Sequence, residues 1–282
     1  MEKFTEHISD TAFWIAAFRA RETERTDAVF KDSLAKKLAG EKGLNMVLKT
    51  PNSDAMAFAM IVRTTSIDRL INSALSEGID AVINLGAGLD TRPYRLQLPP
   101  TLQWIEVDFD GIIQYKNELL AGDKPACNLK RIAANLSDGA ERKALFAKLG
   151  SEIKSALIIT EGVIGYLSND NAAQLSEDIF NIPAFKFWIM DYNRGAMRRN
   201  NQSKKLADTL KHTPLIFDVA EPFSFFSEQG WKIKENISIL DEGDRIGRSM
   251  PILFPWSFLI KILPPIRNLG NRTYGCVMFC KV

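Results

Sequence analysis

The chain reads NLGAGLDTRPYR from Asn84 to Arg95, where the short apolar run Ala81–Leu85 passes into a glycine-rich turn. Glycines such as Gly86 and Gly88 let the backbone turn sharply and approach a ligand closely. In an open parallel sheet, ligands bind beyond the carboxyl ends of the strands, near the point where the strand order reverses. This stretch therefore predicts a strand followed by a ligand-binding turn.

Short apolar runs alternate with helix-like stretches from residue 81 onward. This alternation indicates βαβ units and a largely parallel sheet with helices on both faces, which is an α/β fold. The tail differs, because no clear helix pattern follows its last apolar run, so an antiparallel pair of strands at one edge is expected there. The expected strands are Ala81–Leu85, Trp104–Val107, Leu129–Ala134, Ala156–Thr160, Phe185–Met190, Lys232–Leu240 and Tyr274–Val282.

We expect residues 1–282 to form one domain, with an N-terminal helical segment over residues 1–78 and a core over residues 79–282. Within the helical segment, residues 1–50 are amphipathic. A further helix is expected over Ser53–Ser76, with Gly78 as its C-terminal cap.

Two insertions are expected in the core. A polar, helix-like stretch near residues 194–222 is expected to form a covering insertion, and an apolar insertion is expected near residues 250–270. Prolines in Pro251–Ile266 leave only Trp256–Leu263 free to be helical. We expect these lid-like insertions, with the N-terminal helices, to cover an acceptor pocket; membrane-surface binding and self-association are the alternatives for the apolar one.

Composition excludes several classes of protein. The chain has 36 Lys and Arg residues and 34 Asp and Glu residues. This small difference is not the basic excess that a nucleic-acid-binding protein would show. The three cysteines Cys127, Cys276 and Cys280 show no zinc-site spacing, and no metal site is expected. The start MEKFTEHISD lacks the pattern of a signal peptide, and no uncharged apolar run reaches the roughly 18 residues of a spanning helix. A cytoplasmic location without a membrane span is expected.

A carboxylate follows the glycine turn at a spacing that matters for nucleosides. The second expected strand ends in Glu106-Val107-Asp108, 20 residues after Gly88. A carboxylate at this place can accept hydrogen bonds from both ribose hydroxyls of an adenosine. The turn and Asp108 together predict an adenosine-containing cofactor, whereas an ordinary glycine-rich turn is the plain alternative.

The turn favours S-adenosylmethionine over a nicotinamide dinucleotide. A dinucleotide site has a third glycine that lets the helix start pack under the pyrophosphate, but position 91 is Thr. Asp90 would also place a negative charge beside that pyrophosphate. S-adenosylmethionine has no phosphate, and its ammonium and sulfonium groups tolerate a nearby carboxylate. A nicotinamide oxidoreductase and a cofactor-binding protein without catalysis remain the alternatives.

Three stretches in this order resemble the leucine carboxyl methyltransferase family: NLGAGLDTRPYRL, WIEVDFDGIIQYKNELL and IITEGVIGYLS. Residues 9–40 are similar to the family's N-terminal helical segment. The resemblance implies a Rossmann-like, doubly wound sheet of seven strands whose last strand is antiparallel. The family includes an enzyme that methylates the C-terminal leucine of a protein and many bacterial O-methyltransferases of small-molecule synthesis.

The resemblance also implies roles for particular residues. Arg63, in VRTTSID, would pair with the carboxylate of the cofactor's methionine part, and Glu161 would lie near its ammonium group. Asn135-Leu136 stands where the family usually has Asp and an apolar residue near the adenine. Lys36 or Lys37 would lie near the methionine end, although either is equally a solvated helix residue. The expected cofactor-binding set is Arg63, Gly86, Gly88, Asp90, Asp108, Asn135, Leu136 and Glu161.

The acceptor is less determined. Methyl transfer is an in-line displacement that depends on positioning, and only a poorly acidic nucleophile needs a base. Tyr166, Tyr192 and His212 are the candidate catalytic residues, whereas His7 reads as a surface residue. The expected activity is O-methylation of a small carboxylic acid or phenol with S-adenosylhomocysteine as product; methylation of a protein C-terminus is the alternative.

Overall fold

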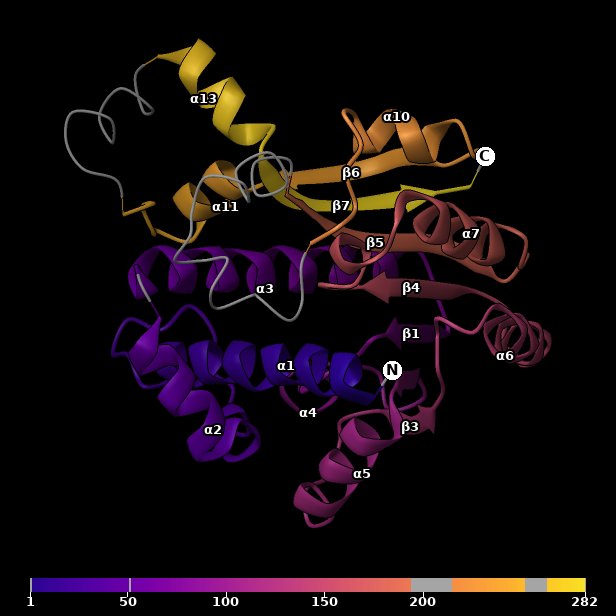
Figure 1. The fold of residues 1–282 in the computed structure, drawn as a ribbon, viewed down its shortest axis with the longest axis horizontal. Coiled ribbons are helices and arrows are strands. Elements are labelled where there is room, and N and C mark those ends of the chain that lie inside the picture. The colour runs from indigo at the N-terminus through magenta and orange to yellow at the C-terminus, as the bar shows by residue number, and fades with distance from the viewer. Residues whose placement is uncertain (1, 51, 194–214, 252–262, 282) are drawn as a thin grey trace. The chain divides into compact units, whose positions relative to one another are not determined.

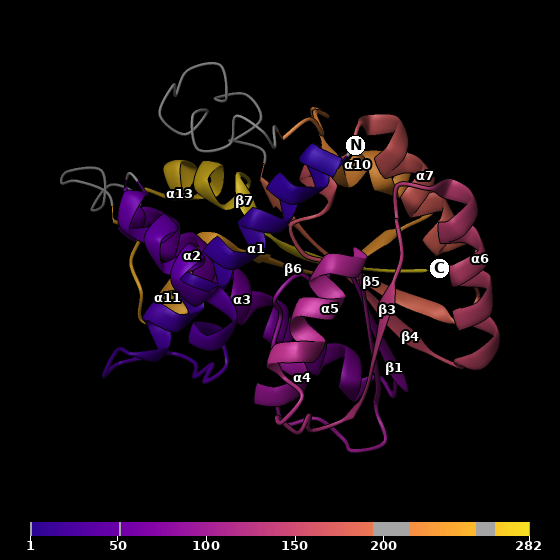
Figure 2. The same ribbon diagram turned by 60° about the horizontal axis from the view of Figure 1, so that its bottom comes forward.

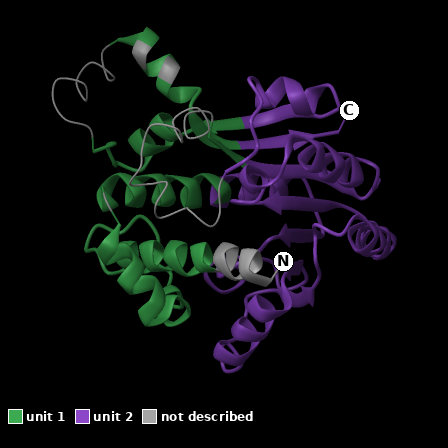
Figure 3. Ribbon diagram, in the orientation of Figure 1, with its two compact units in different colours: residues 1–67, 191–214, 236–276 green, residues 68–190, 215–235, 277–282 purple. Residues whose placement is uncertain are grey.

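The computed structural model describes residues 2–50, 52–193, 215–251 and 263–281 of the chain. These residues form two compact units whose segments interleave along the sequence (Figure 3). The first unit consists of residues 1–67, 191–214 and 236–276, and the second of residues 68–190, 215–235 and 277–282. Several strands and one long helix therefore contribute residues to both units.

Seven strands form one sheet in the order β3-β2-β1-β4-β5-β7-β6 (Figure 1). The neighbours from β3 to β5 pair in parallel, and β7 runs antiparallel, which confirms the predicted Rossmann-like α/β class. The strands are β1 (Ala81–Leu85), β2 (Gln103–Asp108), β3 (Asn128–Ala133), β4 (Ala156–Thr160), β5 (Phe185–Asn193), β6 (Lys232–Ser238) and β7 (Tyr274–Cys280).

The position of each strand in the sheet follows from its residues. The central strands β1 and β4 read AVINL and ALIIT, and every residue in both is buried. Such uninterrupted apolar runs are typical of parallel strands that are covered on both faces. In contrast, β3 lies at an edge of the sheet and has no fully buried residue. The sequence pattern alone therefore separates the centre of the sheet from this edge.

The strand order locates the ligand-binding edge. The strand β1 pairs with β2 on one side and with β4 on the other. The chain therefore proceeds from β1 toward β3 in one direction and from β4 toward β6 in the other. In sheets of this kind the ligand crevice opens at the carboxyl ends of the two strands where the direction reverses. The residues that directly follow β1, β2 and β4 thus lie where a ligand is expected to bind.

Helices connect these strands and also precede them. The helix α5 contacts β2 and β3, and Figure 2 shows it alongside β3. In the first unit α1 packs on α2 so closely that a Cβ added to Gly43 would lie 2.3 Å from the carbonyl oxygen of Phe13. The helices are α1 (Glu2–Thr23), α2 (Ala35–Lys49), α3 (Ser53–Ser76), α4 (Arg92–Arg95), α5 (Asp110–Leu119), α6 (Gly139–Glu152), α7 (Asn169–Phe180), α10 (Pro222–Ser227), α11 (Ile239–Arg245) and α13 (Pro264–Asn271), with a 3₁₀ turn η1 (Ile164–Tyr166).

The long helix α3 has the bounds that its apolar periodicity predicts, and Gly78 follows it with a φ of 80°. The expected strand Lys232–Leu240 is too long by two residues. The strand β6 ends at Ser238, whose hydroxyl accepts the backbone N–H of Asp241 and so caps α11. The expected strand Tyr274–Val282 ends at Cys280. The short helices α10 and α13 were not predicted.

Parts of the two expected insertions lie outside the described residues. This holds for residues 194–214 of the covering insertion and for residues 252–262, which include most of the proposed helix Trp256–Leu263. Within the described ranges, no helix has the length and apolar character that crossing a membrane requires.

Candidate functional site

The glycine turn that follows β1 has the geometry its sequence predicts. Gly86 has a φ of 66° and Gly88 a φ of 48°, which are left-handed conformations that side chains disfavour. The backbone N–H groups of Gly86 and Ala87 both donate to the carbonyl oxygen of Val107, at 2.8 and 3.2 Å. The turn after β1 is thereby attached to the last residues of β2.

Close packing also requires a glycine at position 86. A Cβ added to Gly86 would lie 2.6 Å from Cγ2 of Val163, a distance that real Cβ atoms do not show. Val163 belongs to the loop after β4, so the turn after β1 and the loop after β4 meet without space for a side chain. This contact brings together the two chain segments that flank the point of strand reversal.

Asp108 ends β2 and holds the glycine turn. Its Oδ2 accepts the backbone N–H of Gly88 at 2.6 Å, and its Oδ1 accepts the N–H of Phe109 at 2.7 Å. Burial raises the pKa of Asp108, and the two N–H donors oppose that rise because they favour the ionised form. Each carboxylate oxygen has a second lone pair, so Asp108 can still accept hydrogen bonds from a pair of hydroxyl groups.

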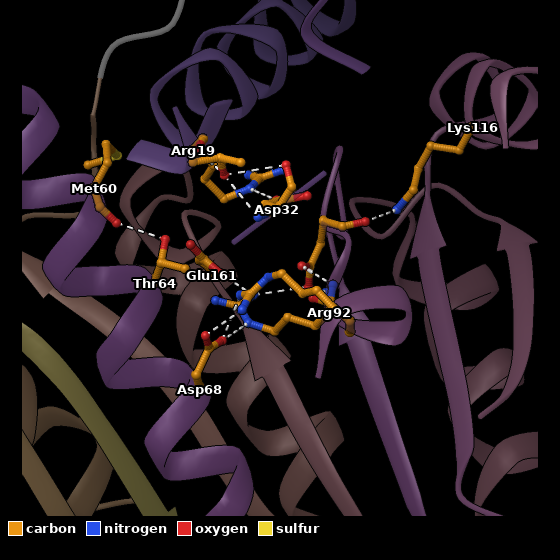
Figure 4. A network of polar contacts seen from close by, with 12 residues as sticks. Arg19, Asp32, Met60, Thr64, Asp68, Arg92, Lys116 and Glu161 are labelled. Carbon is orange, nitrogen blue, oxygen red and sulfur yellow. Dashed lines mark hydrogen bonds and ion pairs between the residues drawn. The ribbon is translucent and has the colours of Figure 1, made fainter. Parts of the chain in front are cut away.

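The buried guanidinium of Arg92 lies among three carboxylates (Figure 4). Its Nη1 lies 2.7 Å from Oε2 of Glu161 and 3.0 Å from Oδ2 of Asp90, and its Nε lies 2.7 Å from Oδ1 of Asp68. Burial alone would lower the pKa of Arg92, but the three carboxylates hold it well above its usual range. Arg92 therefore stays charged and connects three elements of the second unit.

Arg95 completes this arrangement, because it binds both oxygens of Asp68 at 2.6 and 2.8 Å. We call Asp68, Asp90, Arg92, Arg95 and Glu161 the Arg92 cluster. Asp68 comes from α3, both arginines from α4, and Glu161 directly follows β4. No sequence pattern predicts a role for Asp68, Arg92 or Arg95. A signal is present, since these charged residues stand inside the stretches VRTTSID and NLGAGLDTRPYR.

Asp90 is occupied by contacts within the protein. Its Oδ2 accepts the side-chain N–H of Asn84 at 2.8 Å, and its Oδ1 accepts the backbone N–H of Arg92 at 3.0 Å. Lys116, on α5, donates to the carbonyl oxygen of Asp90 at 2.9 Å. These contacts give Asp90 a part in shaping the turn, while its expected contact with the cofactor stays a prediction.

Lys116 also belongs to a fully buried ion pair beneath the turn. Its Nζ lies 2.8 Å from Oε2 of Glu106, and Nε of Arg131 lies at the same distance from that oxygen. The side chains of Lys116 and Glu106 are both completely buried. A buried carboxylate requires such partners because the transfer of an unpaired charge out of water is costly.

The loop after β3 lies next to the end of β2, because the N–H of Ala134 donates to the carbonyl oxygen of Asp108 at 3.0 Å. Asn135 is half-buried, and its Oδ1 accepts the N–H of Ser137 at 3.1 Å. Arg142 donates to the carbonyl oxygen of Leu136 at 2.7 Å. The loop is thereby fixed, and the expected adenine contact of Asn135 would use the second lone pair of its oxygen.

Arg63 belongs to the first unit, where its Nη1 lies 3.3 Å from Oδ2 of Asp191, near the end of β5. The seven other residues of the expected cofactor-binding set belong to the second unit. Lys36 is exposed and pairs with Glu24 at 2.7 Å, and Lys37 is exposed as well. The contacts of Lys36 are those of a solvated helix residue.

The candidate catalytic residues have different surroundings. Tyr166 is half-buried in η1, five residues after Glu161, in the second unit. Tyr192 is buried in the first unit, and its hydroxyl lies 3.0 Å from Oδ1 of Asn236 and 3.4 Å from the carbonyl oxygen of Asn271. These contacts give the Tyr192 hydroxyl a structural function. His212 and the side chain of His7 lie outside the described residues.

The described end of the covering insertion meets the loop that contains Glu161 and Tyr166. The N–H groups of Ile216 and Phe217 donate to the carbonyl oxygen of Gly165 at 2.9 and 3.2 Å. Two hydrogen bonds between Asp218 and Asn169 extend this contact. Residues 215–218 thus adjoin the loop that follows β4.

Comparison with known proteins identifies relatives of the chain. Residues 12–180 match the model of the family described as leucine carboxyl methyltransferase. A predicted S-adenosyl-L-methionine-dependent methyltransferase of Streptomyces coelicolor is 32% identical over 171 residues, which are 57% of this chain and 60% of that relative. A protein of the same description from Mycobacterium bovis is 25% identical over 272 residues, which cover 88% of this chain and 87% of the relative.

Solved structures share the fold at low sequence identity. A protein of the DUF574 family from Streptomyces avermitilis superposes with a TM-score of 0.58 and 13% identity, over 95% of this chain and 97% of that one. A predicted methyltransferase from Thermobifida fusca superposes with a TM-score of 0.56 and 15% identity, over 94% of each chain. At such identities the likeness bears on the fold alone.

Proposed function

The chain belongs to the leucine carboxyl methyltransferase family, and we propose that it is an S-adenosylmethionine-dependent O-methyltransferase. Its acceptor would be a carboxylate or a phenolic hydroxyl of a small molecule, with S-adenosylhomocysteine as the other product. One observation carries the proposal: the carboxylate that ends β2 holds the glycine turn that follows β1, through the bond between Asp108 and Gly88. A carboxylate beside a backbone turn at the reversal of the sheet supports this proposal, because it could accept hydrogen bonds from a ribose there.

The residues around this turn fit the groups of S-adenosylmethionine. Asp108 keeps lone pairs for the two ribose hydroxyls. Glu161 supplies a carboxylate for the ammonium group, and Leu136 supplies an apolar side chain for the adenine beside the acceptor of Asn135. For Arg63, which belongs to the first unit, the family resemblance implies the methionine carboxylate as a bidentate partner. The cofactor supplies a methyl group that its sulfonium activates for displacement.

The start of α4 argues against a dinucleotide. A pyrophosphate needs free N–H groups at a helix N-terminus. The helix α4 is only four residues long, its second residue Pro93 has no N–H, and the N–H of Arg92 donates to Asp90. The negative charge of Asp90 would also repel a phosphate. These features favour S-adenosylmethionine over a nicotinamide cofactor.

A carboxylic acid is the acceptor that the chemistry favours first. A carboxylate is already ionised at neutral pH and requires only alignment with the methyl group, whereas an alcohol needs a general base. The family is named for carboxyl methylation. A phenol is the next choice, with Tyr166 as a residue that could contact the acceptor. The C-terminal carboxylate of a protein would satisfy the same chemistry.

Titration calorimetry tests the cofactor. We expect S-adenosylhomocysteine to bind with a micromolar dissociation constant and NAD to give no heat of binding. Binding of NAD without binding of S-adenosylhomocysteine would refute the proposal and favour an oxidoreductase.

A transfer assay tests the acceptor. The protein would be incubated with methyl-labelled S-adenosylmethionine and pools of carboxylic acids, phenols, and peptides ending in leucine. Products would then be treated with mild base, which releases methanol from a methyl ester but leaves an aryl methyl ether intact. Label released as methanol would identify a carboxylate acceptor. Label confined to the peptides would replace the small-molecule proposal with methylation of a protein C-terminus.

A further inference from the structure

Arg92 binds the carboxylate of Glu161, which the proposed function assigns to the ammonium group of the cofactor. We infer that Arg92 is a positioning residue, which holds Glu161 in place and offsets its charge so that Glu161 can bind the ammonium group of S-adenosylmethionine. The inference rests on the proposed function, in which Glu161 is the ammonium partner. It assigns a role to the guanidinium in the middle of the Arg92 cluster.

The geometry leaves the Arg92 side chain little freedom. Its side chain is only 3% exposed. Nε is bound by Asp68 from α3, and Nη1 is shared between Asp90 and Glu161. A guanidinium is planar, so fixing Nε and Nη1 determines the direction in which its N–H groups point. The donor that faces Glu161 is therefore oriented before any ligand arrives, and Figure 4 shows Arg92 between Asp68 and Glu161.

Glu161 depends on this donor because of where it lies in the chain. It directly follows β4, whose last residue Thr160 is fully buried, and its own side chain is 15% exposed. A carboxylate with so little access to water requires charged partners to remain ionised. Its bond to Arg92, at 2.7 Å, is a short charge-assisted hydrogen bond of that kind.

The charges of the cluster favour a cationic ligand. Three carboxylates, Asp68, Asp90 and Glu161, face two guanidiniums, Arg92 and Arg95, so their formal charges of −3 and +2 leave −1. Within the second unit, Lys116 and Arg131 are already offset by Glu106 and by Asp108, one charge each. An ammonium group next to Glu161 would balance the cluster.

Arg92 also prevents the opposite outcome. Without its guanidinium, Asp68 would keep its two bonds to Arg95, whereas Asp90 and Glu161 would lose the ion pairs that they share at Nη1 of Arg92. Asp90 and Glu161 would then repel each other, and Glu161 would take up a proton or turn away. In either case the carboxylate would be lost to the ammonium group, while the ribose contact at Asp108 would remain.

Two ligands separate positioning of Glu161 from a general effect on the site. S-adenosylhomocysteine has the ammonium group, and 5′-methylthioadenosine has the same nucleoside thioether without the amino-acid end. We expect Arg92→Gln to weaken binding of S-adenosylhomocysteine about tenfold, as loss of a charge-assisted contact does. Its dissociation constant for 5′-methylthioadenosine should stay within about twofold of the wild-type value.

Three further variants complete the experiment. Arg92→Lys should recover part of the lost affinity, because it returns the charge but not the planar set of donors. Arg69 lies on the same helix α3 as Asp68 and forms an exposed ion pair with Glu235 of β6. The control variant Arg69→Gln removes this guanidinium and should leave the binding of both ligands unchanged. Glu161→Gln should weaken S-adenosylhomocysteine at least as much as Arg92→Gln. The double variant should bind it no more weakly than Glu161→Gln alone, since Arg92 acts through Glu161.

The outcomes distinguish the inference from its premise. If Glu161→Gln binds S-adenosylhomocysteine like the wild type, the proposed role of Glu161 is wrong. If Glu161→Gln weakens that binding but Arg92→Gln does not, only the inference fails. Equal weakening of both ligands by Arg92→Gln would mean that Arg92 merely maintains the fold. Should Arg92→Gln not fold, Arg92→Lys carries the test, with S-adenosylhomocysteine weakened and 5′-methylthioadenosine unchanged as the supporting result.

Discussion

The carboxylate of Asp108 accepts the backbone N–H of Gly88 at 2.6 Å, so the residue expected to bind the ribose also holds the turn beside it. The two residues are 20 positions apart in the chain and meet because β1 and β2 are neighbours in the sheet. One side chain has a hydrogen bond that shapes the turn, and the proposed function would give its remaining lone pairs to a ligand.

Substitutions at Asp108 should separate these functions. Asp108→Asn keeps an oxygen for the Gly88 N–H but loses the charge, and should weaken S-adenosylhomocysteine binding by about 1–3 kcal/mol. Asp108→Ala should lose the same affinity and also about 1 kcal/mol of unfolding free energy, because the turn loses its acceptor. Calorimetry and urea denaturation measure the two effects. Equal stability of the two variants would contradict the structural function of the bond.

Gly86→Ala should impair both folding and cofactor binding. The added Cβ would suffer the strain of a φ of 66° and would meet Val163 at 2.6 Å. Gly78→Ala is a matched control, because Gly78 has a φ of 80° but no atom within 4 Å of an added Cβ. We expect the free energy of unfolding, measured by urea denaturation, to fall by about 1 kcal/mol for the control and by at least about 2 kcal/mol for Gly86→Ala. Recovery in the double variant Gly86→Ala, Val163→Ala would identify the clash as the cause.

Lys116→Met should destabilise the protein by about 3–5 kcal/mol, because Glu106 would lose one of its two partners at a fully buried position. It should also weaken S-adenosylhomocysteine binding, since Lys116 fixes the backbone of Asp90. The double variant Lys116→Met, Glu106→Gln removes the charge as well and should recover part of the stability. No recovery in urea denaturation would indicate that the lysine stem, and not its charge, is what matters.

Cys127 should be unreactive in the folded protein. Burial, with a smaller effect from the charge of Glu106, raises the pKa of its thiol to about 11. Above pH 9 the thiol ionises in the unfolded chain but stays protonated in the folded one up to about pH 11. The unfolded state then binds fewer protons, so the free energy of unfolding should fall as the pH rises through this window.

Alkylation with iodoacetamide followed by mass spectrometry measures this reactivity. At pH 9.5, Cys127 should be labelled rapidly only when the chain is unfolded, whereas the half-buried Cys280 should react in the folded protein. The variant Cys127→Ala should lose less stability than the wild type between pH 9 and pH 11. Fast labelling of Cys127 in the folded protein would contradict the burial seen here.

Much of the fold was predictable because it depends on local patterns. The runs AVINL and ALIIT have the length and composition of buried parallel strands, and β1 and β4 have the predicted bounds. The helix α3 follows from apolar periodicity over Ser53–Ser76. The wrongly predicted end of β6 has a local cause too. Ser238 caps α11 by accepting the N–H of Asp241, but the apolar residues that follow Ser238 continue the sequence pattern of a strand.

The candidate site was predictable only in part. Gly86 and Gly88 were identifiable because a sharp turn after a strand requires left-handed conformations. The importance of Arg92 was not, because two of its three carboxylate partners lie 24 residues away at Asp68 and 69 residues away at Glu161. No periodicity or turn rule relates residues at such separations. Similarly, nothing in the sequence showed that the Tyr192 hydroxyl would donate a hydrogen bond to Asn236.

Local sequence is enough to predict the strands, the glycine turn and the carboxylate spacing, because backbone conformation and burial depend on residues close together in the chain. The pairing of the buried charges depends on tertiary contacts. The strand order places the ends of β1, β2 and β4 side by side, and the low polarity of that interior requires each buried charge to find a partner there. The shape of the turn from Asn84 to Arg95 therefore depends on its own residues, whereas the charged residues around it are brought there by the order of the strands in the sheet.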